Sequence, residues 1–68
     1  MKYYKKDQCY YKVIDQRSIV VYDFELLPTI SVTSKIYLDD SIKISSGEFY
    51  DAFQKVSNRI KELFYENQ

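Results

Sequence analysis

The sequence predicts a two-layer α+β domain, in which an antiparallel β-meander of three to four strands precedes one C-terminal amphipathic helix. Short runs rich in β-branched and aromatic residues alternate with a period of two, and clusters of turn-forming residues separate them. The C-terminal part of the chain changes to a period of 3.6 residues. Strands without intervening helices favour antiparallel pairing. A length of 68 residues leaves room for a single domain, residues 1–68.

The first part of the chain contains a short arm and one predicted strand. Residues 1–7 have no clear period, and we interpret them as a mobile basic arm. From about residue 8 to residue 15, tyrosine and β-branched residues alternate, which predicts the first strand. The polar segment that follows, residues 15–18, predicts a reversal of the chain.

The second strand is predicted at about residues 18–27, and Pro28 ends it because proline cannot donate to a β-ladder. Asp23 and Glu25 fall on the same face of this strand, which indicates that this face is exposed to water. The opposite face is therefore expected to meet the helix, and it carries Val20, Tyr22, Phe24 and Leu26.

Two further strands are predicted before the helix. The run at about residues 29–38 alternates throughout, and its expected inward side chains are Ile30, Val32, Ile36 and Leu38. Asp39, Asp40 and Ser41 then supply turn chemistry, because short polar side chains bond their own backbone. A short fourth strand at about residues 42–44 leads directly into the helix.

The helix is predicted at about residues 46–66 from its cap and its apolar stripe. Ser45 and Glu48 have capping-box spacing, and Ile44 and Phe49 stand at the two positions of a hydrophobic staple. Apolar residues then recur every three or four positions, which predicts a helix that packs on one face of the sheet. These residues are Phe49, Phe53, Val56, Ile60 and Leu63.

The residue inventory argues against an enzyme. The chain has no histidine, so the usual general base at neutral pH is missing, and Cys9 has no partner to activate it. Gly47 is the only glycine, which excludes a glycine-rich phosphate loop. The carboxylates of Asp23 and Glu25 are interpreted as solvated groups on an exposed strand face. We therefore expect no catalytic site, no cofactor and no metal site.

Composition also predicts the setting and the state of association. A single cysteine, no signal peptide and no long apolar run indicate a soluble cytoplasmic protein that does not enter the membrane. A domain of this size buries a small core and cannot form an internal disulfide from one cysteine. Self-association is the remaining way to cover apolar surface, so we predict a homodimer.

The function predicted first is binding of a protein, either a second copy or another partner, through the sheet face that the helix leaves uncovered. Mixed aromatic, aliphatic and hydroxyl side chains on that face are typical of an interface with an apolar centre and a polar rim. The candidate interface residues are Tyr10, Ile19, Val21, Thr33, Lys35 and Tyr37.

The alternative function is binding of single-stranded nucleic acid by a basic, tyrosine-rich N-terminal segment. Lysines neutralise phosphates, and tyrosine rings stack on unpaired bases. The candidate residues are Lys2, Tyr3, Tyr4, Lys5, Lys6, Tyr10 and Lys12. Equal numbers of basic and acidic residues, ten of each, and an acidic middle section argue against this function.

The segment from Ile42 to Phe49, in which a short strand runs straight into a capped helix, is similar to the small coactivator, Whirly and purine-rich-element families. The resemblance covers about a third of the chain, and the motif is general cap chemistry. Those families bind single-stranded nucleic acid as dimers. The resemblance therefore implies a four-stranded meander with a C-terminal helix; it makes nucleic acid an alternative partner and not the favoured one, because this sequence lacks a basic strand face.

Overall fold

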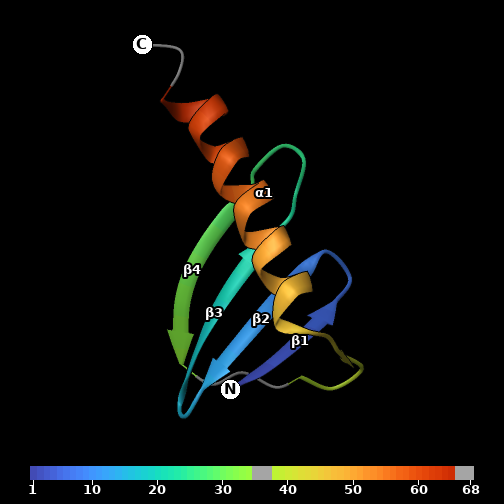
Figure 1. Cartoon of the computed structure of the whole chain (residues 1–68). Coiled ribbons are helices and arrows are strands. Elements are labelled where there is room, and N and C mark those ends of the chain that lie inside the picture. The colour runs from blue at the N-terminus through green and yellow to red at the C-terminus, as the bar shows by residue number, and fades with distance from the viewer. Residues whose placement is uncertain (35–37, 66–68) are drawn as a thin grey trace.

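The described part of the chain forms one five-stranded antiparallel sheet with a single helix lying diagonally across one of its faces (Figure 1). The computed structural model describes residues 1–34 and 38–65. The strands are β1 (Lys2–Lys6), β2 (Cys9–Ile14), β3 (Arg17–Tyr22), β4 (Thr29–Ser34) and β5 (Ile42–Lys43), and the helix is α1 (Ser46–Phe64). This architecture is the α+β two-layer fold that the sequence predicts.

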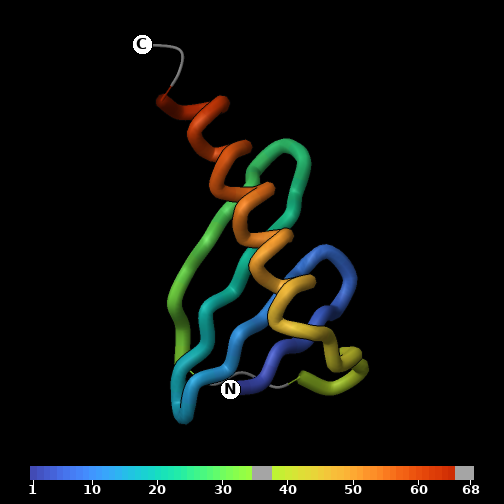
Figure 2. The backbone as a smooth tube through the Cα atoms, in the orientation of Figure 1, coloured from blue at the N-terminus to red at the C-terminus, as the bar shows by residue number. Residues whose placement is uncertain are grey.

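The strand order in the sheet is β4-β3-β2-β1-β5. Strands β1 to β4 follow one another as a meander, and β5 then pairs with the free edge of β1. The N-terminal segment is therefore an internal strand, with a partner on each side, where the sequence predicted a separate mobile arm. The tube in Figure 2 follows the chain from the hairpins of the sheet into the helix.

Two tight hairpins join the first three strands, and each contains the dipeptide Asp-Gln. Lys6 pairs with Cys9 across the first turn, and Asp7 takes the left-handed backbone conformation with φ of 54°. Asp15 in the second turn has the same φ of 54°. Aspartate tolerates this conformation better than most residues, because its short side chain can bond the local backbone.

The helix begins as its cap predicts. The backbone N–H of Glu48 donates to the Ser45 side-chain oxygen at 3.1 Å. The staple residues Ile44 and Phe49 are both buried in the core. The helix is described to Phe64, so the last residue of the predicted range, residue 66, lies outside the described part of the chain.

The core lies between the helix and the face of the sheet that the sequence assigned to water. Val21 is completely buried there, together with Phe49 and Val56 from the helix. Tyr10 and Ile19 pack against the same cluster. These three strand residues were predicted to lie on the uncovered face, and that prediction is wrong.

The error in β3 has a local physical cause. The sequence was interpreted as one strand from residue 18 to residue 27, and Asp23 and Glu25 then marked the face of Val21 as wet. The strand ends at Tyr22, so neither carboxylate belongs to its alternation. Asp23 instead pairs with Lys55 of the helix at 3.0 Å. Val20 and Val21 are both fully buried, so hydrophobicity alone could not select the inner face.

Phe24 and Leu26, predicted to point inward, lie in the loop between β3 and β4 and are 41% and 91% exposed. In β4 the alternation was assigned correctly at Ile30, which packs against the core. Of the remaining interface candidates, Thr33 lies on the face opposite the helix, because it pairs with Ser18. Lys35 and Tyr37 lie outside the described residues.

Candidate functional site

The sheet face opposite the helix carries lysine, tyrosine and hydroxyl side chains. The pairing register places its side chains in three rows across the strands. The middle row is Lys43, Tyr4, Tyr11, Val20 and Ser31. The row on one side is Lys6, Cys9, Tyr22 and Thr29. The row on the other side is Lys2, Val13, Ser18 and Thr33. Lysines therefore lie along the β1–β5 edge, tyrosines lie towards the middle, and hydroxyl side chains lie along β4.

Three lysines on this face surround one tyrosine. Tyr4 lies between Lys2 and Lys6 along β1, two residues from each, and it pairs with Lys43 on β5. Successive residues on one face of a strand are about 7 Å apart, and neighbouring strands are about 4.8 Å apart. We call Lys2, Tyr4, Lys6 and Lys43 the lysine–tyrosine cluster. Lys2 and Lys43 are exposed, whereas Tyr4 and Lys6 are half-buried.

The sheet separates basic from acidic residues. The five strands contain six of the ten basic residues of the chain and no aspartate or glutamate. The carboxylates within the described ranges lie in turns, loops and the helix. Asp7 and Asp15 occupy the hairpin turns, and Asp23 and Glu25 lie in the β3–β4 loop. Although the whole chain has equal numbers of basic and acidic residues, every charged side chain in the five strands is positive.

The centre of this face is closed to solvent. Val20 and Ser18 are fully buried, and Tyr11 is 9% exposed. Burial raises the pKa of Tyr11 to about 12, and the neighbouring Cys9 adds to the rise. The accessible part of the face is therefore its margin, where the lysine–tyrosine cluster lies.

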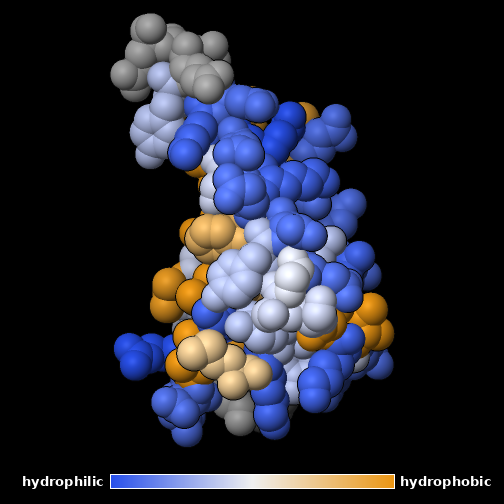
Figure 3. Space-filling model, in the orientation of Figure 1, coloured by the Kyte–Doolittle hydropathy of each residue, from blue (hydrophilic) through white to orange (hydrophobic). Residues whose placement is uncertain are grey.

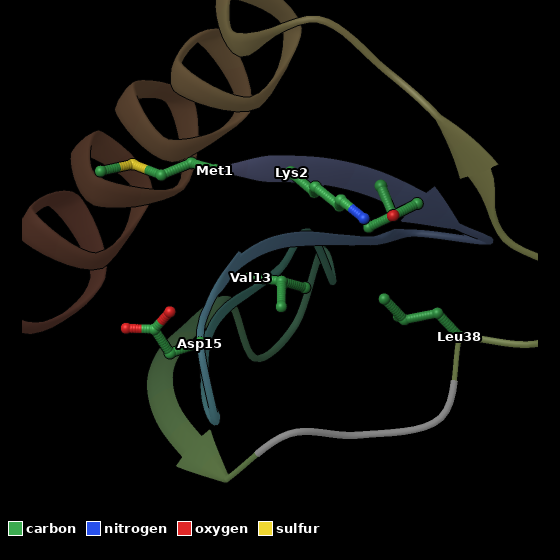
Figure 4. A pocket seen from close by; sticks show the side chains of 6 residues that line it. Met1, Lys2, Val13, Asp15 and Leu38 are labelled. Atoms are coloured by element: carbon green, nitrogen blue, oxygen red, sulfur yellow. The ribbon is translucent and has the colours of Figure 1, made fainter.

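A hollow of about 360 Å³ lies beside the cluster (Figure 4). It is lined by Met1, Lys2, Tyr4, Val13, Asp15 and Leu38. The side chains of Val13 and Leu38 extend into the same space, and Leu38 comes from the connection between β4 and β5. The floor of the hollow is apolar, and Lys2 and Asp15 place one positive and one negative group at its rim.

The nucleic-acid candidates from the sequence divide between the two faces of the sheet. Lys2, Tyr4 and Lys6 lie in the lysine–tyrosine cluster. The other four candidates, Tyr3, Lys5, Tyr10 and Lys12, point to the helix side. Sequence reasoning missed Lys43 as a member of the cluster. The residue lies next to Tyr4 only because β5 pairs with β1, and this pairing joins segments that are far apart in the sequence.

On the helix side, Lys12 is engaged by aromatic rings. Its ammonium donates a hydrogen bond to the Tyr50 hydroxyl and lies 4.9 Å from the centre of that ring and 5.9 Å from the ring of Tyr3. The hydrogen bond raises the pKa of Lys12 and lowers the pKa of Tyr50. Lys5 lies 5.3 Å from the ring centre of Tyr10. These lysines already contact protein aromatic rings, which distinguishes them from the lysines of the cluster.

Within residues 1–34 and 38–65, no group of three or more His, Cys, Asp or Glu side chains is arranged to hold a metal ion. The helix in this part of the chain is not long and apolar enough to cross a membrane. Comparisons of the chain with protein-family models, with curated proteins and with solved structures gave no match. Function is therefore inferred from the residues and their arrangement.

Proposed function

We propose that this protein binds single-stranded nucleic acid at the lysine–tyrosine cluster. The observation that carries the proposal is the absence of carboxylates from the five described strands, combined with three lysines around a half-buried tyrosine on one face. Lysines attract the phosphate backbone, and a tyrosine ring stacks on an unpaired base without regard to its sequence.

The arrangement weakens the main argument against this function, although one carboxylate of the acidic section, Asp15, lines the hollow beside the cluster. The acidic middle section was expected to repel a phosphate chain, but Asp23 lies on the helix side, in an ion pair with Lys55. Glu48 and Asp51 lie on the helix itself. Because these carboxylates are on the other side of the sheet, their repulsion at the cluster is screened by distance, solvent and salt.

The sequence favoured protein binding through the uncovered face, but three of the candidate interface residues do not lie on that face. Val21, Ile19 and Tyr10 belong to the packing beneath the helix. Thr33 alone of the described candidates remains on the opposite face. Single-stranded nucleic acid is therefore the better match to the surface that is accessible there.

A binding titration with two neighbouring lysines tests the proposal. The probe is a fluorescent oligothymidine of about 16 nucleotides, titrated by anisotropy between about 50 and 200 mM salt. Each phosphate contact contributes about 0.7 to the slope of log affinity against log salt, so three lysines predict a slope of about −2. Lys6→Gln should reduce the slope by about 0.7, because Lys6 lies in the cluster.

Lys5→Gln is the matched control, because Lys5 is the adjacent residue of the same strand and points to the helix side. It removes the same charge from the chain and should leave the slope unchanged. Tyr4→Ala should weaken binding by about tenfold, whereas Tyr4→Phe should retain it, since the ring provides the stacking. Absence of binding at the lowest salt, or equal losses for the two lysine variants, would refute the proposed site.

A further inference from the structure

Strand β4 lies at one edge of the sheet, and among the described residues it pairs only with β3 (Figure 1). The other edge is β5, which has two residues and carries Lys43. A strand at an edge presents a row of unpaired backbone N–H and C=O groups, which can pair with a further strand. Because β4 has six residues, it is the edge that offers a further strand the longer match.

β4 lacks the features by which edge strands usually avoid pairing, which are charged side chains, proline, a bulge or a short length. Its six residues include no charged residue and no proline. Its pairing with β3 runs residue by residue from Thr29 to Ser34, without a bulge. Each of the other four described strands contains a lysine or an arginine, although three of them lie inside the sheet. The longer edge of the sheet is therefore the one with no protection against pairing.

The side chains of β4 alternate between aliphatic groups on the helix side and hydroxyl groups on the opposite face. Ile30 pairs with Val21 and Val32 pairs with Ile19, which places both aliphatic side chains on the helix side. Ile30 packs against the core, whereas Val32 is 70% exposed. Figure 3 shows hydrophobic surface reaching the margin of the molecule on the β4 side. The helix therefore covers one half of β4 and leaves the aliphatic side chain of the other half exposed.

A second copy of β4 complements this pattern. When two identical strands pair antiparallel about a two-fold axis perpendicular to the sheet, each residue faces a residue that points to the same side of the sheet. With the axis at Ser31, this residue faces its own copy. The flanking pairs are then Ile30 with Val32 and Thr29 with Thr33. Every pair joins similar side chains, aliphatic on the helix side and hydroxyl on the other.

The same register brings the exposed half of each strand next to the covered half of the other. Val32 of one copy lies beside Ile30 of the other, which packs beneath its own helix. The contact forms twice, once on each side of the axis. Because β4 has no charged residue, two copies of it approach without electrostatic repulsion. A strand of another protein would form the same backbone hydrogen bonds, but a second copy presents the matching order of side chains by symmetry.

We propose that two copies of this chain pair through β4 and form one continuous sheet of ten strands, five from each copy. The two-fold axis places both helices on one face of this sheet and both lysine–tyrosine clusters on the other, towards its two ends. The contact shares no residue with the cluster, so the dimer and the nucleic-acid site are tested through different residues. Pairing also stabilises the folded state of a domain of 68 residues, whose own core is small.

Opposite charges introduced at Ser31 test the pairing and its register. Ser31→Lys places two ammonium groups opposite each other across the axis, and Ser31→Glu places two carboxylates there. Light scattering during gel filtration should give the wild type twice the chain mass of 8.2 kDa. Each variant alone should dimerise at least about tenfold more weakly than the wild type. An equal mixture of the two variants should regain the double mass, because a positive side chain then faces a negative one at the axis.

Gln54→Lys is the matched control, because it adds the same charge at an exposed residue of the helix and should leave dimerisation unchanged. Far-UV circular dichroism follows the fold, and where a single variant loses structure, mixing the two should restore helix content together with the double mass. A wild type that remains monomeric at the highest concentration measured would overturn the proposal. A dimer that tolerates either charge at Ser31, or a mixture of the two variants that does not associate, would overturn it as well, because Ser31 would not lie at the axis.

Discussion

Replacing Phe49 by alanine removes the largest completely buried side chain among the residues that the structure describes. Its ring lies 5.5 Å from the ring of Tyr3, 5.2 Å from that of Tyr50 and 6.2 Å from that of Phe53, measured between centroids. Truncation of a buried phenylalanine to alanine costs about 3–5 kcal/mol, through lost burial and the cavity left behind. A domain of this length has a free energy of unfolding of about 3–10 kcal/mol. Phe49→Ala is therefore expected to bring the protein close to unfolding at room temperature.

Tyr50→Ala provides the control, because Tyr50 is the next residue in the same helical turn and is 45% exposed. The gain in helix propensity on substitution by alanine is similar for both aromatic residues. Urea unfolding followed by far-UV circular dichroism should show a loss of at least about 3 kcal/mol for Phe49→Ala and about 1 kcal/mol for Tyr50→Ala. Equal losses, or a loss below about 2 kcal/mol for Phe49→Ala, would refute the placement of the core beneath the helix.

Three further outcomes are expected. Because the pKa of Tyr11 is about 12 in the folded state against 10.0 for the ordinary group, the free energy of unfolding should decrease between about pH 10 and 12 by about 2–3 kcal/mol. Urea unfolding measured between these pH values should show that this decrease in the free energy of unfolding is absent from Tyr11→Phe. Lys12→Met should raise the pKa of Tyr50, which loses its hydrogen-bonding ammonium, and the phenolate absorbance of wild type and variant should report the change. Ser45→Ala should lower the free energy of unfolding by about 1 kcal/mol through loss of the bond to the Glu48 amide, whereas Ser46→Ala should have little effect in the same urea titration.

The helix and its entry could be predicted because their signals are local. The cap at Ser45, the staple from Ile44 to Phe49 and the apolar stripe each depend on residues within a few positions of one another. Because these signals are local, the apolar stripe does not show at which residue the helix stops packing on the sheet. Nothing in the spacing of Leu63 distinguishes a side chain packed on the sheet from one that extends beyond it.

Strand β1 was missed although the sequence contains a signal for it. The dipeptide Asp-Gln occurs at residues 7–8 and again at 15–16, and the second occurrence was recognised as a reversal. Both form two-residue hairpin turns with the aspartate in the left-handed conformation. A repeat of one turn dipeptide at an interval of eight residues predicts two hairpins and therefore a strand before the first turn. Residues 2–6 consist of lysines and tyrosines, and this basic composition was interpreted as a flexible arm instead of a strand.

Sheet register, which no local pattern fixes, explains why charge counted along the chain did not reveal the lysine–tyrosine cluster. In β1 the neighbours Lys5 and Lys6 point to opposite faces, so a basic run in the sequence supplies only alternate charges to either surface. Lys43 joins Lys2 and Lys6 because β5 pairs with β1. Carboxylates of the described residues lie outside the strands, in turns, loops and the helix. The electrostatic potential that a phosphate chain meets is therefore set by which residues share a face, and a neutral chain can gather three lysines on one part of its surface.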